Sequence, residues 1–483
     1  MTSTTNNNAI EGASRFENAG ELVNAMERED EVVGEGDDKV MFVSVSKNNI
    51  TAQTRKGYHD SNKRLVIWLY LKESDVLNED VVTTINLLCR SVFVDEKAKN
   101  KAMNKTALEI VEKASADFHP ITFSLLTVKI FMMFLFEMGR KNKVGIGSIL
   151  GKSGITKYRS ALMDLYRDCE VCVCEEFERD LSIKVKGLIR THATEKERLG
   201  GRLTEGKEPM SFALYKLLSN SFLINGSKDA VFARAFMTLT WNLMCRSVNS
   251  VFIHRNHISW TGDCMTIQFA HMKSDKEGKE SSRKRHIYAN PINPAICCPT
   301  AIALYLMTHP QETEGTLFSK KSYCRFSKIL AVTAERERAA IERLGVDLDN
   351  IGVHSIRKGS ATYACSGTTA APNISSVCIR AGWTMGKVKD VYLQYAEAGD
   401  QHVGRVVSGL PVLDIRFSST SPFFKVDDGN LPAEGTCTVT DVDEFVKLVF
   451  PFTVPVAFRL VATQLSCCVA LYYSELNAIL LPW

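Results

Sequence analysis

The most informative stretch of this sequence reads HSIRKGSATYACSG at residues 354–367 and, after a short interval, IRAGWTMGKVKDVYLQY at residues 379–395. His354 and Arg357 are three residues apart, so on a single helix their side chains share one face. A turn at Trp383 follows, and a predicted helix over 385–397 then carries Tyr392. The stretch therefore gathers an imidazole, a guanidinium, an indole and a phenol within 39 residues.

Two further basic residues lie upstream of this stretch. Arg246 is near the end of a helix predicted over 229–248, and Lys273 ends the second strand of a predicted hairpin. Taken singly, each residue has an ordinary interpretation, such as a surface arginine whose stem covers apolar atoms or a solvated loop lysine. Taken together, they supply a nucleophile, two fixed cations and a proton donor, which phosphodiester cleavage without a metal ion requires.

The order of these residues resembles the tyrosine recombinases of the phage-integrase family. In both, an arginine precedes a hairpin lysine, a His-x-x-Arg motif, a His or Trp and a tyrosine, and Trp383 lies nine residues before Tyr392. HSIRKGSATYACSG, the RAGW segment and AGDQHVGR at 398–405 look like the Crypton-type recombinases of eukaryotic mobile elements. The resemblance covers roughly residues 50–410 and is most specific over 352–406.

The resemblance implies a catalytic set and a mechanism. Tyr392 would attack the phosphorus and form a 3′-phosphotyrosyl link, and Lys273 would protonate the departing 5′-oxygen. The two arginines would hold the phosphate oxygens through bidentate forks, so that no metal, ATP or other cofactor is expected. The implied catalytic residues are Arg246, Lys273, His354, Arg357, Trp383 and Tyr392.

Some positions leave alternatives open. Tyr395 lies on the same helical face as Tyr392 and is a second candidate nucleophile, while Lys276 and Lys279 compete with Lys273. The family usually has an acidic residue three positions after the first arginine, and this chain has Asn249 there, which can hydrogen-bond but cannot pair charge.

The charge distribution favours a polyanionic partner. Residues 1–40 hold ten acidic and three basic residues, so they carry −7 of a net charge of +4 and leave about +11 on the remainder. Double-stranded DNA is the partner that the resemblance implies. The basic residues that we expect to contact phosphate, or simply to be solvated, are Arg55, Lys56, Lys63, Arg64, Arg283, Lys284 and Arg285. The last three also form a candidate nuclear import signal.

Fourteen cysteines raise the question of disulfides or a metal site. With no secretory signal apparent, disulfides are not expected. Cys169, Cys172 and Cys174 approach zinc-ligand spacing but lack a second ligand pair, so core thiols are the preferred interpretation over zinc. The apolar run 460–473 is too short to span a membrane, and a buried helix is expected.

Hydrophobic periodicity predicts a mainly α fold with a small antiparallel β hairpin or sheet (α+β). We expect an acidic disordered tail at 1–45, an all-helical core-binding domain at 50–194, a linker at 195–209, a tyrosine-recombinase catalytic domain at 210–410 and an extension at 411–483 with an apolar helix. Ser211 is expected to cap the first helix of the catalytic domain. The predicted strands are 257–260, 264–271 and 286–289, and the other predicted helices are 80–92, 104–116, 120–140, 155–192, 211–222, 300–308, 322–344, 354–365, 373–381 and 455–480.

Three functions fit these observations. The first is a site-specific recombinase or integrase of a mobile element, acting as a homotetramer on two DNA sites, in the nucleus of a eukaryote or otherwise on DNA in the cytoplasm. A second is a domesticated recombinase that binds DNA without cutting it. A more distant third is a type IB topoisomerase. The apolar helix at 455–480 would either dock into a neighbouring protomer or pack in the core of its own domain.

Overall fold

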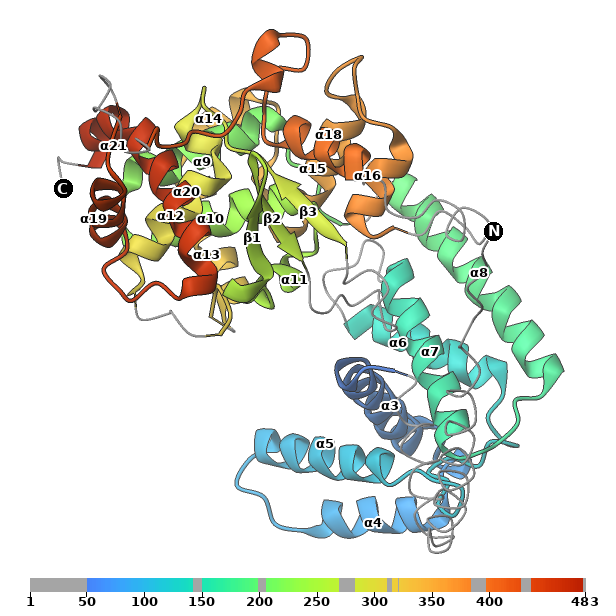
Figure 1. Cartoon of the computed structure of the whole chain (residues 1–483). Coiled ribbons are helices and arrows are strands. Elements are labelled where there is room, and N and C mark those ends of the chain that lie inside the picture. The colour runs from blue at the N-terminus through green and yellow to red at the C-terminus, as the bar shows by residue number, and fades with distance from the viewer. Residues whose placement is uncertain are drawn as a thin grey trace, which may run out of the picture. The chain divides into compact units, whose positions relative to one another are not determined.

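The computed structural model describes residues 50–141, 150–198, 206–268, 283–310, 315–319, 321–383, 397–426 and 436–480. The chain divides into two compact units, Met1–Glu205 and Gly206–Trp483 (Figure 1). Within the described residues the first unit is helical, and the second adds one three-stranded antiparallel sheet. The predicted mainly α fold with a small sheet is confirmed. The acidic tail lies outside the described residues.

Unit 1 is built around α3, which packs against α5 and α7 and contributes Leu65, Trp68 and Leu69 to the core. Its helices are α3 (Ala52–Lys72), α4 (Glu79–Arg90), α5 (Glu96–Glu112), α6 (Val128–Lys141), α7 (Lys152–Asp168) and α8 (Glu175–Arg198). Side chains at their N-termini account for several of these starts. Asn78 caps α4, and Asp95 caps α5, which begins at Glu96, eight residues before the predicted start.

The single helix predicted over 155–192 is wrong, because the chain breaks into α7 and α8. Glu170 adopts a left-handed conformation with φ 53°, and the N–H of Val171 donates to the carbonyl of Tyr166 at 2.9 Å. Cys169 is buried in the core, where burial raises the pKa of its thiol to about 12, whereas Cys172 and Cys174 are exposed. The core-thiol prediction therefore holds for Cys169 alone. Over the described residues, no three histidine, cysteine or acidic side chains gather as metal ligands.

Unit 2 surrounds α10, in which every residue from Ala230 to Leu243 is buried. Its helices are α9 (Phe212–Asn225), α10 (Lys228–Leu243), α11 (Ser247–Val251), α12 (Cys298–Thr308), α13 (Ser322–Arg336), α14 (Arg338–Arg343), α15 (Val353–Ser366), α16 (Ile374–Ala381), α18 (Glu397–Val407), α19 (Val439–Val449), α20 (Arg459–Leu471) and α21 (Tyr473–Leu480). Ser211 caps α9 as predicted, by accepting from the amide of Leu214.

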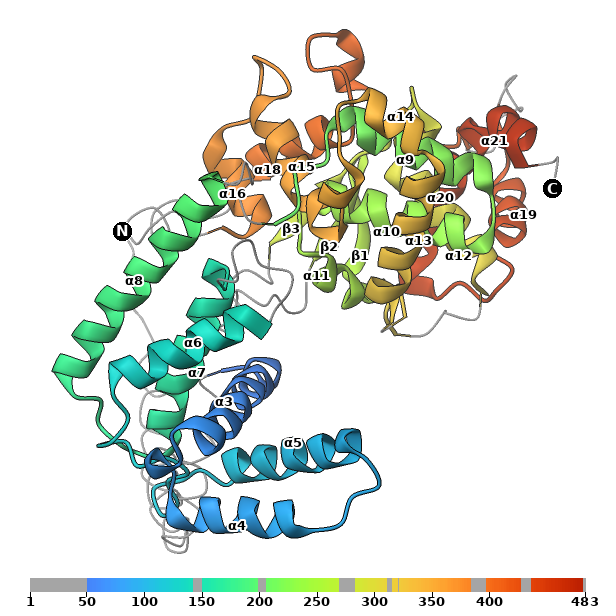
Figure 2. The same cartoon turned by 180° about the vertical axis from the view of Figure 1, so that it is seen from behind.

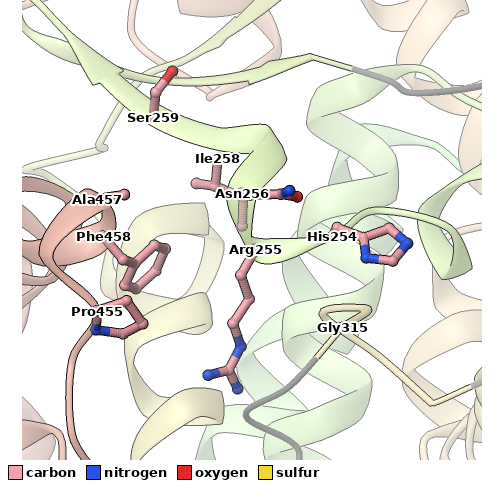
Figure 3. Close-up of a pocket in the computed structure, with 9 residues that line it drawn as sticks. All are labelled: His254, Arg255, Asn256, Ile258, Ser259, Gly315, Pro455, Ala457 and Phe458. Carbon is pink, nitrogen blue, oxygen red and sulfur yellow. The ribbon is translucent and has the colours of Figure 1, made fainter.

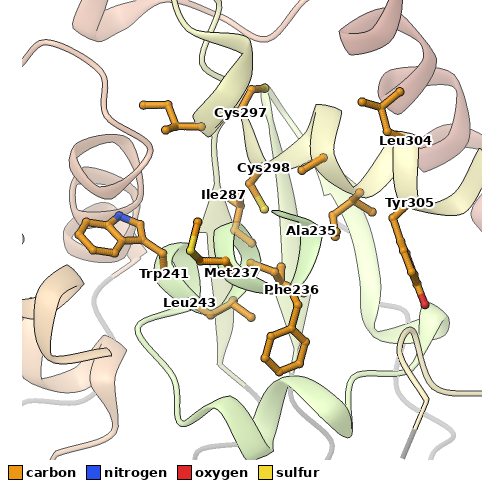
Figure 4. Close-up of a cluster of buried hydrophobic side chains, with 14 of the residues drawn as sticks. Ala235, Phe236, Met237, Trp241, Leu243, Ile287, Cys297, Cys298, Leu304 and Tyr305 are labelled. Atoms are coloured by element: carbon orange, nitrogen blue, oxygen red, sulfur yellow. The ribbon is translucent and has the colours of Figure 1, made fainter. Parts of the chain in front are cut away.

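Aromatic side chains lock the helices of unit 2 together. The rings of Tyr215 and Trp241 stack 4.1 Å apart, and those of Phe212 and Tyr363 do the same, which ties α9 and α10 to α15. The indole N–H of Trp241 donates to the carbonyl of Val407 at the end of α18. Figure 4 shows Trp241 with Phe236, Met237 and Leu243 in this core. The packing of α10 thus sets the positions of α15 and α18.

The sheet has the order β1 (Ile258–Thr261), β2 (Cys264–Gln268) and β3 (Lys284–Ile287). The predicted hairpin is confirmed, with Gly262 in the left-handed turn conformation (φ 58°). The third strand lies two residues earlier than predicted. Seen from behind in Figure 2, α10 lies against this sheet, which it contacts through β3.

The C-terminal region is part of the core of unit 2. Helix α20 packs against α12 and β1, and it buries Val461, Leu465 and Cys468. The helix predicted over 455–480 is instead two helices that meet at 69°. Within the described residues no single helix is long and apolar enough to cross a membrane, although this bent pair reaches that length and composition. Of the two predicted roles for the apolar run, packing in its own domain is the one observed.

Candidate active site

Helix α15 presents the His-x-x-Arg motif at its N-terminal end. Gly352 caps it, and the hydroxyl of Ser355 accepts from the N–H of Gly352 at 3.1 Å. Val353 and Ile356 face the core, so His354 is exposed and Arg357 is half-buried. The predicted helix and the common face of His354 and Arg357 are consistent with this arrangement.

Arg246 lies at the junction between two helices, where a single continuous helix was predicted. The helix predicted over 229–248 ends at Leu243, because Met244 adopts φ 50° and caps α10. A non-glycine residue in this region costs about 1–2 kcal/mol. The next helix, α11, then begins with Arg246 at its N-cap. The sequence between Asn242 and Arg246 contains no glycine, so the break was not predicted.

The guanidinium groups of Arg246 and Arg357 lie close enough to repel each other. Burial lowers the pKa of Arg357, and the positive charge of Arg246 lowers it further. Among the described residues, neither guanidinium has a carboxylate partner within 4.0 Å. Two neighbouring cations without a carboxylate partner favour the binding of an anion.

The C-terminal end of α16 binds one nitrogen of the Arg357 guanidinium. Its Nη2 donates to the carbonyl of Ala381 at 2.6 Å, and the group lies 5.6 Å from the centre of the Trp383 ring. Gly382, in the left-handed region with φ 64°, ends α16 and turns the chain toward Trp383. The indole is 41% exposed. The structure thus brings Arg246, Arg357 and Trp383 into one neighbourhood.

Asn249 lies one helical turn after Arg246 and is 96% buried, since only 4% of its surface is exposed. Its side-chain Nδ2 has no hydrogen-bond partner among the described residues. A buried amide group is normally paired. An acidic residue at this position would add a negative charge, whereas the amide leaves the charge of the arginines uncompensated.

The other candidate catalytic residues lie outside the described residues. These are Lys273 with its competitors Lys276 and Lys279, and Tyr392 with its alternative Tyr395. Their flanks are described, however: β2 and β3 precede and follow residues 269–282, and α16 and α18 do so for residues 384–396.

The predicted phosphate contacts of unit 1 differ in their surroundings. Arg55 pairs with Asp168 at 3.2 Å, and Lys63 pairs with Asp60 at 2.8 Å. Lys56 and Arg64 are exposed, with one Arg64 nitrogen donating to the hydroxyl of Tyr158. Lys56 and Arg64 are therefore more accessible to a phosphate than Arg55 and Lys63 are.

The basic cluster at residues 283–285 needs a correction. Arg285 is completely buried, and its Nη2 donates to the carbonyl of Ile379 at 3.1 Å. It points into the protein because β3 alternates its side chains between the two faces of the sheet. Arg285 is therefore unavailable to a phosphate or an import receptor. Lys284 is exposed and Arg283 is half-buried.

Two cavities lie in unit 2 near these elements. One of about 410 Å³ has His354, Lys207 and Arg338 in its wall and adjoins the N-terminal end of α15. Another of about 400 Å³ lies between residues 254–259 and residues 455–458 (Figure 3). None of the candidate catalytic residues that the structure describes lines this second cavity.

Sequence reasoning did not assign a role to a buried polar cluster behind the site. The cluster consists of His286 on β3, Arg380 on α16 and Asp400 on α18. Arg380 belongs to the RAGW segment and Asp400 to AGDQHVGR, but the sequence of these segments does not predict the contact between the two side chains.

Comparison with known proteins gives distant structural likenesses. No protein-family model matches the chain, and no curated protein sequence does either. The structure of an FLP recombinase–Holliday junction complex is 12% identical, with 65% of this chain and 78% of that chain covered and a TM-score of 0.35. The XerH site-specific recombinase bound to difH substrate, in a pre-cleavage complex, is 14% identical, with 71% and 97% covered and a TM-score of 0.34. These solved structures are recombinases to which this chain is similar.

Proposed function

We propose that this protein cuts and rejoins DNA strands by forming a covalent 3′-phosphotyrosyl intermediate. The observation that carries the proposal is the contact between α11 and α15, which places Arg246 and Arg357 near each other without a carboxylate partner among the described residues. A phosphodiester is an anion whose charge grows on its equatorial oxygens during attack. Fixed arginine forks are suited to that charge.

The remaining roles rest on the sequence resemblance. The phenol oxygen of Tyr392 bonds to phosphorus while the bond from phosphorus to the 5′-oxygen breaks, and Lys273 gives that oxygen its proton. His354, one turn before Arg357, takes up the tyrosine proton. Trp383 flanks the bound phosphate with its indole. Because the phosphotyrosyl bond conserves the energy of the cleaved bond, rejoining needs no ATP.

The proposal extends to the biological reaction. We infer that the substrate is double-stranded DNA at the ends of a mobile element, and that four copies assemble on two sites. The exposed Lys56 and Arg64 of unit 1 and Lys284 of unit 2 would contact the phosphate backbone. Such contacts hold the duplex in register and carry no sequence information.

A covalent-capture assay tests this function. Purified protein is incubated, in a chelating buffer, with a library of nicked duplexes that includes the DNA flanking its own gene. The 5′-hydroxyl fragment diffuses away after cleavage, so the protein stays attached. We expect a protein–DNA band on a denaturing gel that disappears in Tyr392→Phe.

The control variants separate the alternatives. Loss of the band in Tyr395→Phe but not in Tyr392→Phe would move the nucleophile by one helical turn. Salt-sensitive DNA binding without any covalent band would leave a DNA-binding protein that does not cut. Formation of the band only after a divalent metal is added would contradict the proposed chemistry.

A further inference from the structure

Arg380 is a buried cation of unit 2 that donates several hydrogen bonds to backbone carbonyls. Its side chain is completely buried at the end of α16. Nε and Nη2 donate to the carbonyl of Asn242 at 3.1 and 2.8 Å, and Nη2 also donates to the carbonyl of His286 at 2.8 Å. One side chain thereby joins α16 to the end of α10 and to β3.

Asp400 provides the counter-charge from α18. Its Oδ1 lies 2.7 Å from Nη1 of Arg380, and its Oδ2 accepts from both the backbone N–H and the ring Nδ1 of His286 at 2.9 Å. Burial would raise the pKa of this carboxyl, but the charge of Arg380 and the hydrogen bonds from His286 together hold the pKa well below its usual range. Asp400 is therefore ionised within the core.

The Asp400 cluster (His286, Arg380 and Asp400) connects the elements around the candidate active site. Arg380 precedes and Asp400 follows residues 384–396, the segment that contains Tyr392. Asn242 lies four residues before Arg246, and His286 follows residues 269–282, which contain Lys273. The candidate catalytic residues that α15 does not carry therefore lie within four residues of a cluster member or its bonding partner Asn242, or in a segment that a cluster member flanks.

Close packing reinforces these bonds. At Gly404 on α18, an added Cβ would overlap the carbonyl oxygen of His286 and lie 3.2 Å from the ring of Tyr288. Arg285, next to His286, bonds to Ile379 on α16. The three elements β3, α16 and α18 thus have little freedom to shift past one another.

We propose that Asp400 is a positioning residue for the proposed reaction, holding the two ends of the tyrosine-bearing segment together through Arg380 and in register with β3 through His286. This inference rests on the proposed function. A buried ion pair is poor evidence for stability, because its desolvation cost offsets most of the attraction. Its advantage is a fixed geometry, which a reaction depending on sub-ångström placement requires.

The test compares Asp400→Asn with Asp263→Asn. Asp263 pairs with Arg405, also on α18, at 2.6 Å, but this pair is partly exposed and, among the described residues, has no hydrogen bond or ion pair with β3 or Arg380. Covalent capture of a nicked duplex is followed over time at saturating DNA, at a temperature well below the unfolding midpoint of each variant. The experiment yields a rate constant, a final captured fraction and a half-saturating DNA concentration.

For Asp400→Asn we expect the rate constant to fall about 100-fold, with the captured fraction and the half-saturating concentration within about twofold of the wild type. Asp263→Asn should change none of them by more than about threefold. Arg380→Gln combined with Asp400→Asn should be no slower than the slower single variant, since the two residues act as a pair. If Asp400→Asn fails to fold, Asp400→Glu keeps the charge, displaces it by one methylene and should lower the same rate constant.

The outcomes distinguish this inference from the proposed function. A lower captured fraction at an unchanged rate constant would mean that Asp400 serves stability alone, and an unchanged time course would also overturn the inference. Absence of capture by the wild-type protein would overturn the proposed function and this inference with it.

Discussion

At the scale of single residues, the chemistry of the candidate site depends on a geometry that only arginine provides. Arg357 uses one nitrogen to bind the carbonyl of Ala381, which leaves the rest of its planar fork for an anion. A lysine has a single point of charge and cannot fill both roles.

Arg357→Lys should therefore lower the rate constant of covalent capture by about 100-fold or more while changing DNA affinity little. Arg416→Lys is the matched control, because Arg416 pairs with Asp414 at 2.7 Å far along the chain from the motif. The captured fraction on the denaturing gel is measured over time for both. A rate within threefold of the wild type for Arg357→Lys would remove this residue from the catalytic set.

Two buried asparagines make a second prediction at this scale. The Asn242 side chain donates from Nδ2 to Thr238 and accepts at Oδ1 from Ser408, whereas Nδ2 of Asn249 has no partner among the described residues. Asn242→Ala should lower the free energy of unfolding by about 1–3 kcal/mol, because it removes two buried hydrogen bonds and leaves a cavity in place of the amide. Asn249→Ala should change it by less than about 1 kcal/mol. Chemical denaturation measures both, and a larger loss for Asn249→Ala would show that its amide is satisfied.

The predictable part of the site was the part set by local spacing. His354 and Arg357 share a helix because they are three residues apart. The approach of Arg246 depends on the left-handed Met244, whose conformation comes from tertiary packing and leaves no trace in the sequence. The burial of Arg285 was missed for a related reason: a run of three basic residues suggests a surface, but strand alternation turns the third one inward.

At the scale of elements, residues 208–210 form a short strap that positions α15, the helix that carries the His-x-x-Arg motif. The N–H of Glu208 donates to the carbonyl of Asn350, and the N–H of Met210 donates to that of Ser355, both at 2.9 Å. Gly359 on α15 faces this strap, and a Cβ there would overlap the carbonyl oxygen of Met210 and lie 2.9 Å from its nitrogen. Only glycine allows the strap to lie so close.

Gly359→Ala should thus lower the free energy of unfolding of unit 2 by about 1–3 kcal/mol, because both backbones are held by hydrogen bonds and cannot separate freely. Gly187→Ala on α8 is the control, since a Cβ there meets nothing within 4 Å. It should stabilise α8 by about 0.5–1 kcal/mol through helix propensity. Amide exchange in α15 and α8 measures the two effects, and equal signs for both variants would contradict this account.

A buried carboxylate on α7 gives a prediction with a pH dependence. Burial raises the pKa of Asp164, the charge of Asp168 raises it further, and Arg167 partly offsets them. The folded state thus binds this proton more readily than the unfolded chain, so the ionised form costs stability above the folded pKa. Asp164→Asn should stabilise unit 1 at pH 7, and the gain should shrink as pH falls through that pKa.

Asp60→Asn should destabilise unit 1 at pH 7, which is the opposite of the effect expected for Asp164→Asn. The hydrogen bond from Lys63 lowers the pKa of Asp60, so its carboxylate stabilises the folded state at pH 7 and this contribution is lost as pH falls. Amide hydrogen exchange in α3 and α7, measured between pH 7 and pH 4, reports the stability of unit 1 in both variants. Stabilisation by Asp60→Asn at pH 7 would contradict the assignment.

The helices that could be predicted were those with strong periodicity and a capping residue. Helix α15 was expected over 354–365 and spans Val353–Ser366, and α9 begins after the predicted cap Ser211. Breaks without glycine or proline were missed, as at Glu170 between α7 and α8 and at Glu337 between α13 and α14. Helix α19 was not predicted, although Thr438 and Asp441 form a capping box at its start.

At the scale of the whole molecule, charge is unevenly distributed along the chain. The first 40 residues carry −7, and the remaining residues carry about +11. Basic residues attract the phosphate backbone through an interaction that weakens with salt. We expect an acidic segment on the same chain to compete with phosphate for those residues.

Removal of residues 1–40 should therefore tighten DNA binding by about tenfold at low salt, because a competing polyanion is lost. The gain should shrink as the Debye length falls from about 30 Å at 0.01 M salt to about 8 Å at 0.15 M. Fluorescence anisotropy with a random-sequence duplex measures the dissociation constant, in a Tyr392→Phe background that prevents covalent capture. A full-length variant with the ten acidic residues of this segment replaced by amides is the control and should show the same gain. If only the truncation tightens binding, the segment excludes DNA by its bulk, and the electrostatic account is wrong.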